Sequence, residues 1–262
     1  MRRSVLTTSA LLIVGLLTTG ATASERDKAP PVTATDGGNA LDRTPQGAFA
    51  VSAFGTPSAN IGLGATSGVQ TGTGTGRGSE FQGGMTIFGA PIDRLTLFGT
   101  GERRLDGTYA PSAGIILRLF GSRADGWALS IGGKYKAEGF ADVGGETELG
   151  FFGSYARNGW HADANAVVGA GFEEKESDGE ARFRLGYEVA PSVRVGIDGQ
   201  ARYRLAGSRT LAGGRHWDAV GGPQVAASFG HVYGTVTVGP SIVDVASGIG
   251  WTATASVGAV AW

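Results

Sequence analysis

Hydrophobic and polar residues alternate along most of the chain after residue 47. From Trp127 to Glu138, the odd positions carry Trp, Leu, Ile, Gly and Tyr, whereas the even positions are small or charged. A period of two places apolar side chains on one face of a β-strand and polar side chains on the other. The same pattern recurs within 146–155, 160–168, 180–189 and 193–204. The pattern therefore predicts a series of antiparallel β-strands.

Further segments alternate less clearly, and the connections between all segments differ in length. The weaker strands are expected at 80–89, 93–101, 109–120, 217–229, 232–240 and 249–262, with a first one within 47–66. Short turns are expected at 90–92, 121–126, 157–159, 190–192 and 230–231. Longer loops are expected at 66–79, 101–107, 139–145, 173–179, 207–215 and 241–248. Together they predict about 12 strands (10–14) in an up-and-down barrel, with both ends on the short-turn side.

The hairpin around Pro191 allows the strand register to be predicted. The apolar positions are odd on both strands, so a loop of odd length, Ala190 to Ser192, keeps them on one face. The predicted cross-strand pairs are Glu188 with Arg194, Arg184 with Asp198, Glu180 with Arg202, and Phe183 with Gly199. In the same way, Gly230-His231 is predicted to be a two-residue turn, with glycine first.

The apolar face distinguishes a membrane wall from a soluble sandwich. Small residues occupy its middle: Ala162, Ala164, Ala166, Gly133, Gly153 and Gly199. Aromatic residues occupy its two ends: Trp127, Tyr155, Trp160 and Phe229 at one, and Tyr109, Tyr135, Phe172, Tyr203 and Trp217 at the other. Aromatic girdles around an apolar band are typical of a lipid-facing wall. A secreted soluble β-protein, the alternative, would pack bulky aliphatic side chains there.

On these features the chain resembles the bacterial outer-membrane β-barrel proteins from about Gly47 to Trp262. The resemblance implies a place in the outer membrane of a Gram-negative cell, in contact with its lipid. It also implies that the barrel-insertion machinery recognises the last strand through the terminal aromatic residue, Trp262. Two features depart from the pattern. Val257, Ala259 and Ala261 lie on the face opposite Trp262, and Pro223 removes a ladder hydrogen bond in mid-strand.

The N-terminal residues predict export. Arg2 and Arg3 precede an apolar stretch, and Ala21-Thr22-Ala23 follows it as a small-residue cleavage site, so residues 1–23 are expected to be a signal peptide. Residues 24–46 are polar and irregular, and we expect a flexible periplasmic leader there. Its alternative role is a plug or a periplasmic contact. Residues 47–262 are then the transmembrane barrel.

Composition excludes several classes of function. The chain of 262 residues has 47 glycines, no cysteine and a formal net charge of −1. The missing cysteines exclude disulfides and thiolate metal sites, and the balanced charge gives no basis for binding nucleic acid. No cofactor and no metal site is expected.

If the apolar face meets lipid, the polar face lines the barrel interior. The residues expected to line a pore are Lys134, Lys136, Glu146, Glu148, Asp163, Arg182, Arg184, Arg194, Asp198, Arg202 and Arg204. Most of these charges should pair across strands, because unpaired charges are costly in a confined space. About 12 strands leave a narrow lumen. We therefore expect a passive channel for ions or small polar solutes. A non-conducting structural or adhesion barrel that acts through its extracellular loops is the alternative.

No enzymatic activity is expected from the polar residues. Ser154, His161 and Asp163 supply the residue types of a hydrolase triad, but a triad is defined by geometry and not by inventory. His216 and Asp218 are expected at the extracellular mouth, and a surface hydrolase centred on His216 is a further alternative.

Overall fold

The computed structural model describes residues 40–43, 49–56, 60–71, 80–103, 109–137, 145–172, 177–206, 217–243 and 249–261. All of them belong to one compact unit, Gly37–Trp262. The predicted signal peptide, residues 24–39 and 44–46 of the predicted leader, and Trp262 lie outside the described residues.

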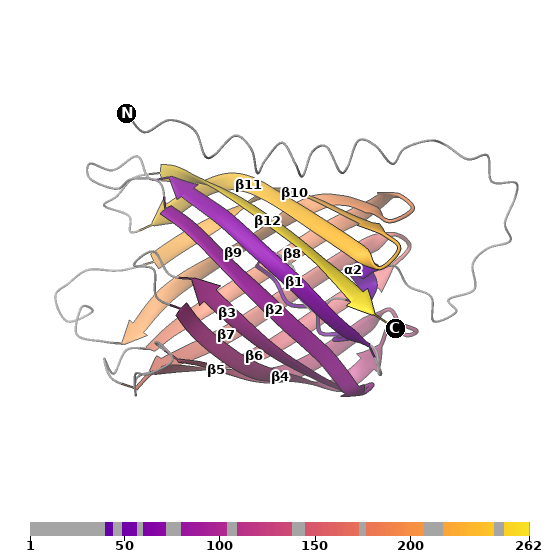
Figure 1. Cartoon of the computed structure of the whole chain (residues 1–262), viewed down its shortest axis with the longest axis horizontal. Coiled ribbons are helices and arrows are strands. Elements are labelled where there is room, and N and C mark those ends of the chain that lie inside the picture. The colour runs from indigo at the N-terminus through magenta and orange to yellow at the C-terminus, as the bar shows by residue number, and fades with distance from the viewer. Residues whose placement is uncertain are drawn as a thin grey trace, which may run out of the picture. The chain divides into compact units, whose positions relative to one another are not determined.

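Twelve antiparallel strands form a closed barrel (Figure 1). They are β1 (Ile61–Thr71), β2 (Glu80–Ile92), β3 (Leu95–Arg103), β4 (Tyr109–Ser122), β5 (Trp127–Ala137), β6 (Gly145–Arg157), β7 (Trp160–Gly171), β8 (Ser177–Ala190), β9 (Val193–Ala206), β10 (Trp217–Phe229), β11 (Val232–Val243) and β12 (Ile249–Ala261). Each strand pairs with its neighbours in sequence, and β1 closes the barrel by pairing with β12. The predicted fold class is confirmed.

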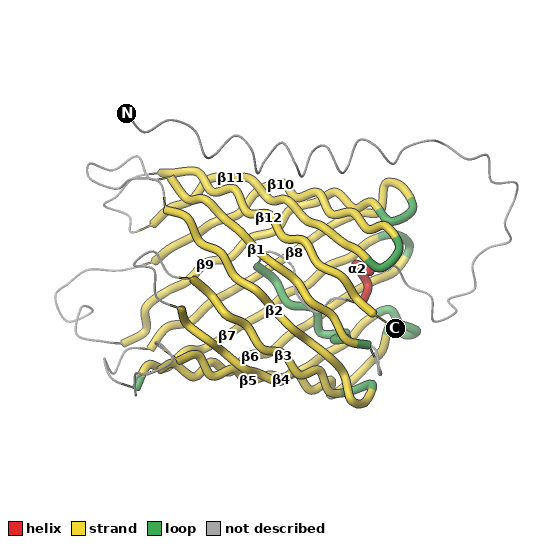
Figure 2. Tube along the Cα trace, viewed as in Figure 1, coloured by secondary structure: helices red, strands yellow, loops and turns green. Residues whose placement is uncertain are grey.

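Short and long connections alternate as the sequence predicted, although the first short turn lies at 93–94 and not at 90–92, because β2 continues to Ile92. Turns of two to four residues join β2 to β3, β4 to β5, β6 to β7, β8 to β9 and β10 to β11, and we call this side of the barrel the short-turn end. The opposite side is the long-connection end. Because the strand number is even, β1 begins and β12 finishes at the short-turn end (Figure 2).

The predicted register of the β8–β9 hairpin is confirmed for all four pairs, including Phe183 with Gly199. The turn itself is shorter than predicted. Only Pro191 and Ser192 lie in it. An irregularity in the pairing between Glu188 and Ala190 leaves one extra residue on β8, and this residue keeps the apolar side chains of both strands on one face. Gly230-His231 forms a two-residue turn as predicted, between the paired residues Phe229 and Val232, and Gly230 adopts a φ of 56°.

The apolar face points outward. Large side chains such as Phe151, Leu149 and Trp251 are exposed on the outer surface, whereas alternate residues in the same strands are buried inside. On β12, Val257, Ala259 and Ala261 also face outward. No helix among the described residues is long and apolar enough to cross a membrane.

The first wall strand begins later than expected. We predicted a strand within 47–66 and a loop over 66–79, but β1 covers Ile61–Thr71. Residues 49–56, named here the inner segment, are absent from the strand ladder and hydrogen-bond to inward side chains of the wall. The segment is largely apolar, with Phe49, Ala50 and Val51 in succession. A short apolar run is also compatible with a strand, so the local pattern could not separate it from the wall strands.

Part of the predicted leader is ordered inside the barrel. Residues Ala40–Arg43 form the short helix α2, which contacts β10, β11 and β12. Ala40 and Leu41 are buried in a cluster with Phe88, Tyr233 and Val260. Inward aromatic side chains thus offer these residues of the predicted leader an apolar surface, which the sequence alone does not indicate.

The proline noted in β10 interrupts one of its two ladders. Pairing with β9 runs through Pro223 without a break. Pairing with β11 skips from Val220 to Gln224, and Pro240 of β11 lies in the matching gap. Because a proline has no N–H to donate, two prolines on one seam explain the gap.

Candidate pore and inner segment

A cavity of about 780 Å³ occupies the part of the lumen toward the long-connection end. One wall of it carries charged side chains from β3, β5, β6, β8 and β9. The other carries glycine and threonine, including Thr66, Gly68 and Thr254. Phe49 and Val51 of the inner segment also line this cavity.

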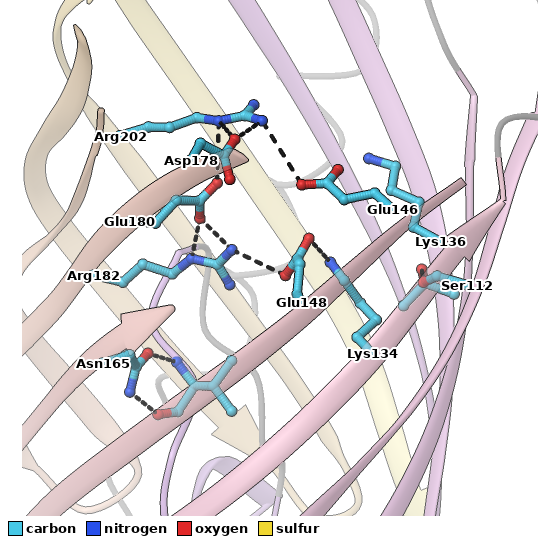
Figure 3. A network of polar contacts seen from close by, with 12 residues as sticks. Ser112, Lys134, Lys136, Glu146, Glu148, Asn165, Asp178, Glu180, Arg182 and Arg202 are labelled. Carbon is cyan, nitrogen blue, oxygen red and sulfur yellow. Dashed lines mark hydrogen bonds and ion pairs between the residues drawn. The ribbon is translucent and has the colours of Figure 1, made fainter. Parts of the chain in front are cut away.

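Ion pairs join most of the charged wall into one network, which links β5, β6, β8 and β9 (Figure 3). Lys134 Nζ lies 2.7 Å from Glu148 Oε1, and the other oxygen of Glu148 is 3.7 Å from Arg182. Arg182 donates from Nε to Glu180 over 2.8 Å. The network therefore links β5, β6 and β8 through alternating charges.

Arg202 extends the network at the long-connection end. Its guanidinium contacts Asp178 directly, lies 3.6 Å from Glu180 Oε1, and lies 4.0 Å from Glu146 Oε1. Lys136 pairs with Glu102 of β3 over 2.9 Å. Acids and bases nearly balance on this wall: the network has four carboxylates (Glu146, Glu148, Asp178 and Glu180) against three cations (Lys134, Arg182 and Arg202), and the neighbouring Lys136–Glu102 pair adds one of each.

Glycine on β7 leaves room for this network. A Cβ at Gly169 would lie 2.4 Å from Glu146 Oε1 and 2.5 Å from Asp178 Oδ1. Carboxylates from β6 and β8 therefore approach each other across β7, and Arg202 neutralises them from β9. The charges stabilise one another and still border the cavity.

The inner segment is bound through its backbone. Asn165 of β7 accepts a hydrogen bond from the N–H of Val51 over 2.7 Å and donates to the C=O of Val51 over 2.8 Å. Asp198 of β9, which is fully buried, accepts from the N–H groups of Phe49 and Ala50 and from Gln224 of β10. Both side chains replace the partner strand that this backbone lacks.

Further wall residues bind the rest of the segment. Ser154 accepts from the N–H of Ala53, and Ser130 donates to its C=O over 2.6 Å. Arg118 donates to the C=O of Phe54, and Thr96 accepts from the N–H of Thr56. The segment therefore spans from β9 to β3 across the lumen.

The inner segment lies between two cavities. Ser52 and Phe54 border a small cavity of about 40 Å³ at the short-turn end. Phe54 and Ala53 are also buried in a cluster with Ile116, Phe152 and Val167. The short-turn half of the lumen is thus filled largely by the segment and α2, and the long-connection half is open.

The predicted pore-lining residues divide into three groups. Lys134, Lys136, Glu146, Glu148, Arg182 and Arg202 line the large cavity. Asp163, Arg184 and Arg194 border the small one, where Arg184 pairs with Asp163 over 2.6 Å. Asp198 holds the inner segment, and Arg204 follows Arg202 on the same face of β9. A role in passing solute stays a prediction for all of them.

Several residues of this site were not expected from the sequence, among them Glu102, Asp178 and Asn165. Glu102 and Asp178 were assigned to loops, but they lie in β3 and β8 and form ion pairs on the charged wall. Both strands extend past the apolar alternation into charged residues, β3 at its end and β8 at its start, so the predicted strands are too short at the long-connection end. Asn165 lies on the inward face of β7, and nothing in the sequence indicates that it binds the backbone of Val51.

The residues considered for catalysis do not form a triad. Ser154 donates its hydroxyl directly to Asp163, with no histidine between them. His161 lies 3.9 Å from Glu188. His216 lies outside the described residues. Within the described part of the chain, no group of three or more His, Asp or Glu side chains is placed to hold a metal ion.

Comparisons with solved structures show two small porins of similar architecture. The NanC porin superposes with a TM-score of 0.57 at 8% sequence identity, over 75% of this chain and 98% of its own. The KdgM porin in complex with disordered oligogalacturonate superposes with a TM-score of 0.53 at 8% identity, over 76% and 98%. This chain has the fold of the small outer-membrane porins. No protein-family model matches the sequence, and no curated protein matches it either.

Proposed function

We propose that this protein is a narrow passive channel for ions or small polar solutes in the outer membrane of a Gram-negative bacterium. The observation that carries the proposal is the polar cavity of about 780 Å³ inside a closed barrel with an apolar outer face. The shared fold with the NanC and KdgM porins supports it. The solute would enter at the long-connection end and meet the inner segment as the narrowest part of its path.

The nearly balanced network predicts weak discrimination between cations and anions. Each carboxylate of the network has a cation within 4.0 Å, so neither sign of charge dominates the wall. Recordings of the purified full-length protein in planar bilayers test the proposal. We expect small current steps and a reversal potential near zero in a salt gradient. A wild-type protein that passes no current above background contradicts the channel.

Replacing Arg202 by Gln tests whether ions pass the network. This change removes one cation beside Glu146, Asp178 and Glu180, so the reversal potential should shift toward cation selectivity. The shift should shrink at high salt, because the Debye length falls from about 10 Å at 0.1 M to about 3 Å at 1 M.

Arg157→Gln is the matched control for Arg202→Gln. Arg157 is exposed at the short-turn end of β6, outside both cavities, so the same loss of charge should leave selectivity unchanged. Equal shifts in the two variants would mean that net charge, and not the network, sets the reversal potential.

We also propose that the remaining sequence features serve export and assembly. Residues 1–23 are removed as a signal peptide, and the insertion machinery recognises the last strand through Trp262. The channel has no catalytic role. The alternative of a non-conducting barrel is supported by the filled short-turn half of the lumen, and the bilayer recordings separate the two.

A further inference from the structure

The inner segment is held inside the barrel without being part of its wall. The twelve strands close by pairing β1 with β12, and no residue of the segment takes part in that ladder. Releasing the segment therefore breaks no hydrogen bond of the wall. The wall groups that it would leave are side chains facing the lumen, where water can replace the lost partners.

Asn165 and Asp198 hold the first residues of the segment, 49–51. Asn165 makes two hydrogen bonds to Val51, and Asp198 accepts from two consecutive amides. Ser154 binds the next stretch through Ala53. Asn165 and Asp198 contact only the main chain of the segment, whereas Ser154 also contacts the hydroxyl of Ser52. The segment turns at residues 53–54, where the N–H of Gly55 donates to the C=O of Ser52 over 3.2 Å. Polar contacts of this kind can be exchanged for water, so the segment can leave its site.

Because of where the segment lies, its release would change the shape of the lumen. Phe49 and Val51 border the large cavity, whereas Ser52 and Phe54 border the small one. The segment thus separates the long-connection half of the lumen from the short-turn end. Moving it aside would join the two cavities.

We propose that residues 49–56 are a displaceable gate of the channel, latched in the closed position by Asn165 and Asp198. The gate rests on the proposed channel function. Closed and open states exist in equilibrium, and the current through the barrel reports the open fraction.

A disulfide between the gate and the wall tests this proposal. The hydroxyl oxygens of Ser52 and Ser154 lie 3.4 Å apart, and the natural chain has no cysteine, so Ser52→Cys with Ser154→Cys introduces a single defined pair. We expect the oxidised double variant to lose its current and dithiothreitol to restore it. Current that is the same in the oxidised and the reduced form overturns the gate.

A second disulfide controls for the oxidation itself. Thr235 and Ser256 are hydrogen-bonded partners on β11 and β12, both in the wall. Thr235→Cys with Ser256→Cys should conduct equally in both redox states. If this wall disulfide also abolished the current, the loss would not come from holding residues 49–56, and the proposal would be contradicted.

Weakening the latch should have the opposite effect. Asn165→Ala removes two hydrogen bonds to Val51, which should raise the open probability by about tenfold. Ser256→Ala, which removes a hydrogen bond within the wall, should leave it unchanged. An unchanged open probability in Asn165→Ala overturns the latch. If the wild type and both cysteine variants all pass no current, the channel itself is overturned.

Discussion

Single glycines determine how the inward aromatic side chains fit against the wall. Phe88 of β2 is almost fully buried and packs with Leu41 and Val260 at the short-turn end of the lumen. Its ring lies over Gly62 of β1, where an added Cβ would come within 2.2 Å of a ring carbon. Because Phe88 is enclosed on its other sides, the ring has little room to move.

We predict that Gly62→Ala destabilises the barrel. The clash with Phe88 should lower the free energy of unfolding by about 1–3 kcal/mol. Gly101→Ala in β3 is the control, since its Cβ would meet nothing within 4 Å. Urea unfolding in lipid vesicles, followed by tryptophan fluorescence, measures both variants. Equal effects would show that the contact with Phe88 is unimportant.

Neighbouring strands are held in register by turns and by pairs of side chains on the outer face. Asn158 and Gly159, both with positive φ, form the turn between β6 and β7. In the next pair of strands, Trp160 of β7 lies opposite Tyr187 of β8. Their ring centroids are 5.0 Å apart, and the angle between the ring planes is 60°. This tilted pair belongs to the aromatic girdle at the short-turn end and links β7 to β8.

We predict an energetic coupling between Trp160 and Tyr187. A double-mutant cycle with Trp160→Ala and Tyr187→Ala should give about 0.5–1.5 kcal/mol in the free energy of unfolding. The control cycle combines Trp160→Ala with Tyr109→Ala, which lies at the other end of the barrel on β4. That cycle should be additive within about 0.5 kcal/mol. A coupling no larger than the control would contradict the ring contact.

At the scale of the whole molecule, the outer surface has an apolar belt between two aromatic girdles. Phe151 lies in the middle of β6 and is 70% exposed, whereas Phe229 ends β10 at the short-turn end and is 86% exposed. In water, a charged side chain would be tolerated equally well at both positions. In a bilayer they differ, because one lies at the midplane and the other at the interface.

We predict that a charge is tolerated differently at these two depths. Phe151→Arg should cost about 2–4 kcal/mol of the free energy of unfolding in lipid vesicles, and Phe229→Arg about 0–1 kcal/mol. Reversible urea titrations of both variants give the comparison. Equal costs would contradict burial of the belt in lipid and, with it, the membrane barrel.

The local pattern of residues was sufficient to predict the wall. Alternation with a period of two identified the strands, and the charges around Pro191 predicted the register of β8 and β9. Both depend on residues close in sequence, or on neighbours in a hairpin. The same reasoning placed the start of the first strand, Glu102 and Asp178 wrongly, because alternation weakens where strands extend beyond the lipid.

The contents of the lumen, in contrast, could be known only from the tertiary structure. Phe49 binds Asp198 and Val51 binds Asn165 across 149 and 114 residues of sequence, and no local pattern reports such contacts. Residues 49–56 are a short, largely apolar run that is compatible with a wall strand, yet every edge of the wall is already paired. The segment therefore satisfies its backbone with inward side chains. Strand periodicity is a property of the chain itself, whereas the occupant of the lumen depends on the space that twelve strands leave between them.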